Sequence, residues 1–269
     1  MTKRIQILLT NDDGIQSPGI WAAASALSKL GFVTVAAPRE QASSTGRSLP
    51  LSSDGKIEPT TLRINDQDWT VYAIGGSPAQ SVLHAVLEIM PEKPDLVVSG
   101  INYGENVGTG ITISGTVGAA IEGAAMGIPA MAVSVQASAE AWYNYIDLDF
   151  STAAYFTHYF ARKILAGSLP PDVDMLKVEV PSHATPETPW RVTRLARHRY
   201  YIPFIERSGA WSENGKIGAR VDVSPEEVAP DSDIYTVRFD QMISVTPISL
   251  DMTSRIPLND LEADLRRRA

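Results

Sequence analysis

The chain has 269 residues, of which 44% are hydrophobic and 20% charged, a balance that excludes a disordered protein or a coiled coil. Its 23 Lys and Arg residues against 31 Asp and Glu give a formal net charge of −8, which argues against a nucleic-acid polymer as partner. The absence of cysteine excludes disulfides and thiolate chemistry. Because there is no membrane-length apolar run and no signal-peptide pattern, we expect a cytoplasmic protein that does not enter a membrane.

Strands and helices alternate in the first part of the chain. The aliphatic run Arg4–Thr10 predicts a strand buried on both faces. A helix is predicted from about Pro18, with Ser17 as N-cap and Gly31 beyond its end, and Phe32–Ala37 is the next strand. This strand–helix–strand order favours a parallel sheet with a right-handed crossover.

A hairpin and a second helix follow. Leu62–Ile64 and Trp69–Ile74 flank the turn-forming run Asn65–Asp68, which predicts two paired strands. Ser77 then caps a helix that extends to about Met90.

The next elements complete an α/β unit. Asp95–Ser99 predicts a buried strand, and residues 100–113 form a loop rich in Gly and Asn. A helix at Ser114–Met126 and a strand at Pro129–Val135 follow. We therefore predict a Rossmann-like, doubly wound, mainly parallel α/β core over residues 1–135.

Beyond this core the pattern changes to a β-rich C-terminal extension, residues 136–269. A helix is predicted at Ser151–Ala166 and a short one at Asn259–Arg268. Strands are predicted at Met175–Val180, Trp190–Leu195, Ile234–Phe239 and Met242–Pro247, and Ser208–Gly218 reads as a long hairpin or loop arm. Such an arm is hard to bury as a lone hairpin.

Three polar clusters follow predicted strands. They are Asn11–Gly14, Ser43–Gly46 and Ser99–Asn102. Ligands of open parallel sheets bind outside the carboxyl ends of the strands. We therefore expect these three loops to meet and form one site.

Adjacent carboxylates at Asp12 and Asp13 suggest a cation site in these loops. A turn in which one Asp caps the next helix would also explain the pair. However, neighbouring carboxylates repel, and folded proteins usually tolerate this when a cation lies between them. With Ser and Asn oxygens nearby and no His or Cys in these loops, the site suits Mg²⁺ or Mn²⁺ rather than zinc.

The predicted helix start at Ser114–Gly118 offers free backbone N–H groups for an anion. Ordinary helix capping by Ser114 is the competing interpretation. The preceding glycines permit close approach of the backbone to a ligand. No G-x-S-x-G elbow is present and all four histidines lie outside the three loops, which argues against a Ser-His-Asp hydrolase.

Four segments together carry a resemblance to a known family. They are LLTNDDGIQSPGI, DLVVSGINYGENVG, SGTVGAAIEG and ISVTPISLDMT, and they resemble the survival protein SurE family in order over nearly the whole chain. The resemblance implies a 5′-nucleotidase that uses a divalent metal ion to hydrolyse nucleoside 5′-monophosphates. Some members also hydrolyse 3′-nucleotides or short polyphosphate. It further implies a C-terminal extension that completes the core and exchanges between subunits of a homodimer or homotetramer.

The resemblance also implies a metal site. Its four ligands match Asp12, Asp13, Ser43 and Asn102, and they would hold one Mg²⁺ or Mn²⁺ per subunit. A one-residue slip would place Ser44 in the position of Ser43.

The substrate phosphate is expected beside Asn106 and the segment formed by Ser114, Gly115 and Thr116. One departure from the family pattern is GSPAQ at residues 76–80, where the family usually has GTPAD, and we assign no role to Gln80.

The expected reaction is direct attack on phosphorus by a metal-activated water, without a phosphoenzyme. Asp12 is expected to activate or orient that water, with Asp13 as the alternative. Ser114 is the one rival nucleophile, but nothing in the sequence is placed to deprotonate it. The alternative function is a nucleotide-binding regulatory protein with little activity, and steady-state turnover of mononucleotides would separate the two.

Overall fold

Buried aliphatic runs form one nine-stranded sheet in the computed structural model, which describes residues 4–64, 67–137, 148–167 and 169–267. Its strand order is β3-β4-β2-β1-β5-β6-β7-β11-β8. Neighbouring strands run parallel except in the pairs β3–β4 and β7–β11. The strands are β1 (Gln6–Thr10), β2 (Phe32–Pro38), β3 (Ile57–Ile64), β4 (Gln67–Ile74), β5 (Leu96–Tyr103), β6 (Ala130–Val135), β7 (Met175–Val180), β8 (Trp190–Val192) and β11 (Ile243–Ile248).

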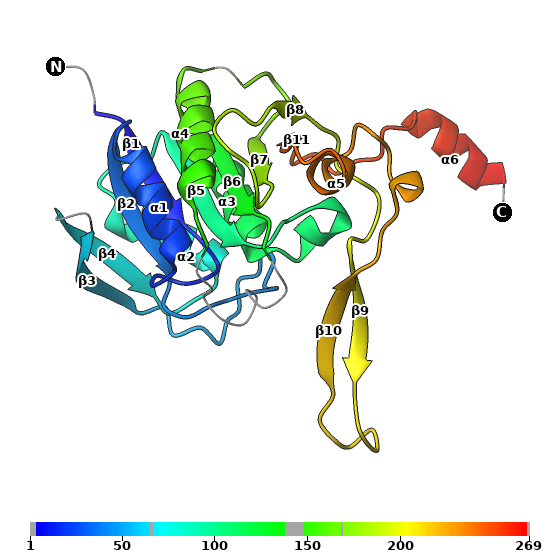
Figure 1. The fold of residues 1–269 in the computed structure, drawn as a ribbon, viewed down its shortest axis with the longest axis horizontal. Coiled ribbons are helices and arrows are strands. Elements are labelled where there is room, and N and C mark those ends of the chain that lie inside the picture. The colour runs from blue at the N-terminus through cyan, green and yellow to red at the C-terminus, as the bar shows by residue number, and fades with distance from the viewer. Residues whose placement is uncertain (1–3, 65–66, 138–147, 168, 268–269) are drawn as a thin grey trace.

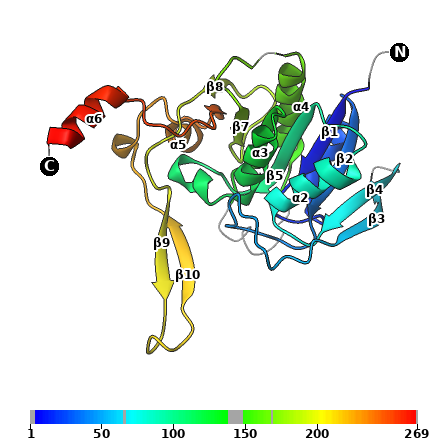
Figure 2. The ribbon, with the colours of Figure 1, turned by 180° about the vertical axis from the view of Figure 1, so that it is seen from behind.

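Helices cover both faces of this sheet (Figures 1 and 2). One face carries α1 (Pro18–Leu27) and α4 (Ser151–Leu165). The other carries α2 (Pro78–His84), its π-helical continuation η1 (Ala85–Ile89), and α3 (Gly115–Ala125).

Strand β1 supplies core residues to both faces. Ile7 and Leu9 pack on the side of α1 and α4, whereas Leu8 packs on the side of α2 and α3. Side chains alternate between faces along a strand, which is why a strand buried on both sides is apolar throughout. The predicted doubly wound, mainly parallel α/β fold is confirmed.

Strand β1 is also the point at which the strand order reverses direction. It lies between β2 and β5 and is parallel to both. Loops leaving the carboxyl ends of two strands at such a point diverge to opposite faces and leave a crevice between them. The residues that follow β1 therefore occupy the position where this fold binds ligands.

The strand predicted at Ile234–Phe239 is wrong, because this segment is helix α5 (Asp233–Arg238). The Ser232 hydroxyl caps the helix by accepting a backbone N–H of its first turn. Ile234 and Val237 are both buried, a spacing of three that fits a helix. Capping and packing here override the strand preference of the β-branched residues.

Several boundaries also differ from those predicted. Strand β3 begins at Ile57 rather than at Leu62, and Gln67 and Asp68 of the predicted turn belong to β4. Strand β5 continues to Tyr103 with an irregularity between Ser99 and Asn102, so the loop starts later than residue 100. A short 3₁₀ helix, η2 (Gly108–Thr112), then lies inside this loop. Strand β8 ends at Val192 rather than at Leu195.

The predicted arm is the antiparallel hairpin of β9 (Tyr201–Glu206) and β10 (Lys216–Val221), and it projects away from the sheet (Figure 1). Helix α6 (Leu258–Arg267) also extends from the body of the molecule. The predicted turn residues 65–66 and Arg268 lie outside the described residues. No helix in the described ranges combines the length and apolarity needed to cross a membrane.

Candidate active site

Three loops converge at the carboxyl ends of β1, β2 and β5. The Ala42 N–H donates to the backbone oxygen of Asp12 over 2.7 Å, which ties the loop after β2 to the loop after β1. The Gly46 N–H donates to the backbone oxygen of Ile113 over 2.9 Å, which ties the same loop to the start of α3. The predicted clustering of the strand-end loops thus occurs.

Two glycines of α3 make this convergence possible. A Cβ on Gly118 would lie 2.4 Å from the backbone of Gly46, and a Cβ on Gly115 would lie 2.7 Å from the Cβ of Asp12. Both distances are shorter than carbon contacts allow. Glycine at these positions lets the helix approach the loops directly.

The Asp12 carboxylate is buried at the N-terminus of α3. It accepts the hydroxyl hydrogen of Thr116. Burial raises the pKa of Asp12, while the hydrogen bonds from Thr116 lower it. Asp12 therefore lies at the same helix end, residues 114–116, at which the sequence predicts phosphate binding.

The Asp13 carboxylate is buried beside the end of β5. It accepts the Tyr103 N–H over 3.2 Å and a hydrogen bond from the Gln41 side chain. Burial raises the pKa of Asp13 to about 8, and the negative charge of Asp12 contributes to that rise.

Ser43 is linked to Asp13 through the side chain of Gln41. Gln41 donates from Nε2 to the Ser43 hydroxyl oxygen over 3.0 Å and also bonds to Asp13. Ser43 is exposed, so its oxygen is accessible to a ligand. The contact through Gln41 favours Ser43 over Ser44 as the serine of the site.

Asn102 is oriented by two backbone carbonyls. Its Nδ2 donates to Tyr103 O over 3.2 Å and to Gly104 O over 2.7 Å. Both amide hydrogens are thereby used, and the side-chain carbonyl oxygen is left for another partner. A hard cation requires that oxygen as its ligand atom.

Asn106 and Ser114 are the two side chains predicted to bind the substrate phosphate through their own polar atoms. The Ser114 hydroxyl oxygen accepts the Val117 N–H over 3.1 Å, which leaves its hydrogen for an anion. Asn106 donates from Nδ2 to Ser134 over 3.0 Å and retains a second amide hydrogen. The predicted capping role of Ser114 and an anion-binding role are therefore compatible.

The donor set fits a hard divalent cation. It offers two carboxylates, a hydroxyl and an amide oxygen, with no sulfur or nitrogen ligand. Within the described ranges, no three His, Asp or Glu side chains form a metal-binding group, so further ligands would come from neutral protein oxygens, water or substrate. Two buried neighbouring carboxylates with raised pKa values are the observation that most favours a cation here.

Sequence reasoning missed Gln41, which joins Ser43 to Asp13. Its one signal was a polar residue in the loop that supplies Ser43. Sequence reasoning also missed Glu179 and Asp233, which accept N–H groups of the loop that carries Asn106. Nothing near them in the sequence pointed to the site.

Comparisons with known proteins agree over the whole chain. The family model described as survival protein SurE matches residues 7–202. A 5′-nucleotidase SurE of Thermococcus kodakarensis is 41% identical, with 96% of this chain and 97% of the relative covered. A 5′-nucleotidase SurE of Methanocella arvoryzae is 40% identical, covering 97% and 98%. The crystal structure of a SurE protein from Aquifex aeolicus matches with a TM-score of 0.73 and 30% identity, covering 98% of this chain and 100% of that one.

The contact between α3 and the loop after β2 can be tested with two glycine substitutions. Gly118→Ala places a methyl group against the Gly46 backbone, and we expect it to lower the free energy of unfolding by about 1–3 kcal/mol. It should also weaken Mn²⁺ binding, measured by calorimetry, because the loop carrying Ser43 must move. Gly110→Ala is the matched control, since a Cβ there meets no atom within 4 Å. Equal behaviour of the two variants would contradict the close contact.

Proposed function

Since the chain belongs to the survival protein SurE family and is a 5′-nucleotidase, we propose that it hydrolyses nucleoside 5′-monophosphates with one bound Mg²⁺ or Mn²⁺ per subunit. The observation that carries this proposal is the pair of buried neighbouring carboxylates, Asp12 and Asp13, at the switch point of the sheet. 3′-Nucleotides and short polyphosphate offer a similar phosphate group and are included as secondary substrates. A cytoplasmic location is part of the same proposal.

Asp12, Asp13, Ser43 and Asn102 would hold the cation. Their oxygens converge from three loops, and two carboxylates formally neutralise one divalent ion. When bound, the ion supplies positive charge for the phosphate oxygens and lowers the pKa of a water molecule.

The substrate phosphate would bind between this group and α3. The Ser114 hydroxyl and the second amide hydrogen of Asn106 are donors with a hydrogen to spare. The N–H groups of Gly115 and Thr116, in the first turn of α3, would also donate to the phosphate. The dipole of α3 adds about half a positive charge at this end.

Asp12 is the residue assigned to orient the attacking water, with Asp13 as the alternative. The Thr116 hydroxyl donates to the Asp12 carboxylate and orients it. Water forms the new bond to phosphorus as the bond to O5′ breaks, and the proton lost by the water ends on a carboxylate or in solvent. The nucleoside O5′ takes up a proton, so one water and one monoester give nucleoside and phosphate.

Asp13→Asn tests the metal site. It removes one carboxylate and keeps an oxygen for the Tyr103 N–H, and we expect AMP hydrolysis to fall by about 100-fold or more. In chelator the variant should unfold at a higher temperature than wild type, because an amide removes the cost of burying or protonating a carboxylate beside Asp12. Added Mg²⁺ or Mn²⁺ should raise the melting temperature of wild type but hardly that of the variant.

Asp95→Asn is the control for this experiment. The Asp95 carboxylate accepts the Gln6 N–H at the opposite end of the same two strands, so metal response and hydrolysis should stay near wild type. Full activity after exhaustive chelation, with metal content checked by mass spectrometry, would contradict the metal requirement. A simple phosphate ester hydrolysed faster than any mononucleotide would contradict the substrate class.

Direct attack by water is favoured because the site offers no uncommitted nucleophile. The chain has no cysteine, and Asp12, Asp13 and Ser43 are assigned to the metal. The Ser114 hydroxyl oxygen accepts the Val117 N–H, and among the described residues no base forms a hydrogen bond with this hydroxyl. The donors around the phosphate therefore serve to bind it rather than to attack it.

Hydrolysis of a mononucleotide with a chirally labelled phosphorus should proceed with inversion of configuration, as expected for a single in-line displacement. No phosphoryl group should pass to added alcohols, and none should remain on protein trapped by acid quench. Retention of configuration would identify a side chain as the nucleophile, and Ser114→Ala would then show whether Ser114 is that side chain.

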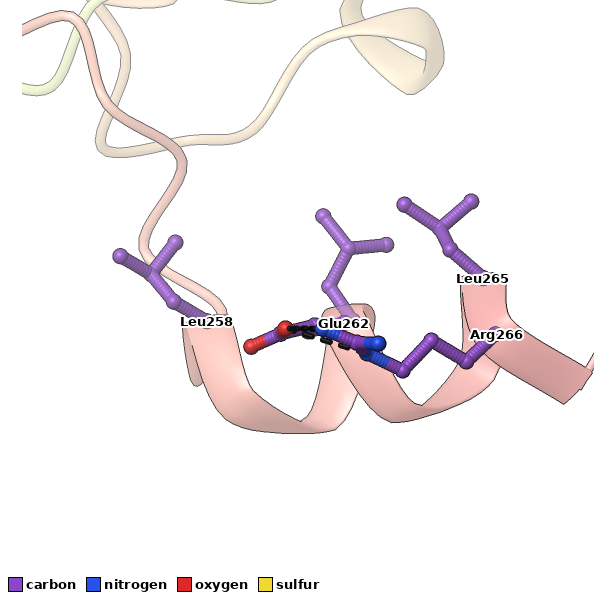
Figure 3. Close-up of a pocket in the computed structure, with 5 residues that line it drawn as sticks. Leu258, Glu262, Leu265 and Arg266 are labelled. Carbon is purple, nitrogen blue, oxygen red and sulfur yellow. Dashed lines mark hydrogen bonds and ion pairs between the residues drawn. The ribbon is translucent and has the colours of Figure 1, made fainter.

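We propose that residues 136–269 complete the core and also mediate assembly into a homodimer or homotetramer. Leu258, Leu261 and Leu265 form an exposed stripe along α6 at helical spacing. In Figure 3 the side chains of Leu258 and Leu265 stand clear of the rest of the molecule, beside the Glu262–Arg266 ion pair. The projecting hairpin also carries a groove, which is lined in part by the exposed Ile205. Exposed apolar surface of this kind favours pairing with another subunit.

Leu265→Glu should therefore shift the protein toward monomer in light scattering at micromolar concentration, because it places a charge in the leucine stripe. Ala263→Glu adds the same charge to the opposite face of α6 and should leave the assembly intact. A wild-type monomer with full activity, or identical behaviour of both variants, would contradict the proposal.

A further inference from the structure

A group of buried ionisable residues lies beyond the carboxylate pair. Lys177 and Glu179 project from the same face of β7, and Asp233 begins α5. The Lys177 Nζ lies 3.1 Å from Asp233 Oδ2 and 3.4 Å from Glu179 Oε1. All three side chains are fully buried.

Both carboxylates also bind one loop. Glu179 Oε2 accepts the Asn106 N–H over 3.0 Å, and Asp233 Oδ2 accepts the Gly108 N–H over 3.0 Å. Lys177 therefore lies between two carboxylates that hold the same stretch of backbone. That stretch carries the side chain of Asn106.

A second contact ties the same loop to the C-terminal half. Glu105 is buried and accepts the Tyr200 hydroxyl hydrogen over 2.7 Å. The loop also packs closely at Gly108, where a Cβ would lie 2.4 Å from the backbone oxygen of His198. Residues 105–108 are thus bound from several sides by groups that do not touch the catalytic pair.

The charges explain why lysine is needed here. Burial alone would lower the pKa of Lys177, but the carboxylates of Glu179 and Asp233 raise it above its usual value, so the ammonium form persists. Burial raises the pKa of Glu179 to about 7, and Lys177 counteracts that rise. Without Lys177, the carboxylates of Glu179 and Asp233 would be buried near each other and would lose the ammonium group that lies between them.

Stability alone does not explain this arrangement. A buried ion pair is often no more stabilising than apolar residues of the same volume, since desolvation of the charges offsets their attraction. Charged acceptors do make shorter and stronger hydrogen bonds to backbone N–H groups, which fixes a loop in one conformation.

We propose that Lys177 is a positioning residue for nucleotide binding, which holds Glu179 and Asp233 against the Asn106 and Gly108 N–H groups and so fixes Asn106 toward the phosphate. This inference rests on the proposed function of Asn106. Lys177 acts through its two carboxylate partners and does not itself contact the substrate.

Hydrogen exchange of the full-length protein tests the positioning without any activity assay. In Lys177→Met, the amides of Asn106 and Gly108 should exchange at least about tenfold faster than in wild type, the size expected for weakening one charge-assisted hydrogen bond. Val178→Ala is the control, because it damages the core on the other face of the same strand and should leave both amides protected. Unchanged protection in Lys177→Met would overturn the proposal.

Kinetics then test whether the positioning serves substrate binding. Lys177→Met should raise the KM for AMP about tenfold with kcat changed less than about threefold, the result expected when binding is lost uniformly. In the Asn106→Ala background the same substitution should have little further effect on KM, because both changes act on one contact. Additive effects on KM would overturn the proposal and leave Lys177 with a structural role.

The two proposals fail in different ways. A wild-type protein without nucleotidase activity, combined with the expected exchange pattern, would overturn the proposed function while the positioning of the loop stands. Glu179→Gln is the second variant should Lys177→Met not fold, because the amide keeps the shape and an acceptor oxygen while losing the charge. It should raise exchange at Asn106 more than at Gly108, and equal exchange at both amides would contradict the assignment of Glu179 to Asn106.

Discussion

Two carboxylates on consecutive residues are buried at the end of β1, and the surrounding loops are arranged around that charge. The Asp12 carboxylate lies at the N-terminus of α3. The Asp13 carboxylate accepts the Tyr103 N–H, the first N–H beyond Asn102 on β5. Neutral dipoles of this kind lower the cost of burial but do not remove it, as the raised pKa values of both groups indicate. The close packing at Gly115 and Gly118 follows from the same requirement, because α3 must come near enough for the Thr116 hydroxyl to reach Asp12.

The sequence predicted the α/β core and the convergence of the strand-end loops, because both follow from local patterns. Apolar runs buried on both faces identify parallel strands, and polar residues directly after them mark one edge of the sheet. The prediction failed at Ile234–Phe239, where β-branched residues suggested a strand while the Ser232 cap and packing of Ile234 and Val237 produce a helix. Neither the cap nor the packing partner can be weighed from composition alone.

The supporting residues of the site were beyond sequence reasoning for a different reason. In β7 the residues Lys177 and Glu179 alternate with apolar Val178 and Val180, a pattern typical of a strand with one face in water. Here that face is buried, and the charges are satisfied by Asp233, more than fifty positions away, and by the loop at Asn106. Burial of a charged face depends on which distant segment covers it, and that information is absent from the local pattern.

The base of the projecting hairpin has a consequence for how the protein responds to its own substrate. Strand β9 begins at Tyr201, and the residue before it, Tyr200, bonds through its hydroxyl to Glu105, the neighbour of Asn106. A second subunit that held the hairpin would therefore also restrain the backbone that carries Asn106, the residue proposed to bind the phosphate. Thermodynamic linkage is reciprocal, so whatever factor subunit contact adds to nucleotide affinity, nucleotide must add to subunit affinity. Assembly and substrate occupancy would then rise together as concentration increases, and dilution would weaken both.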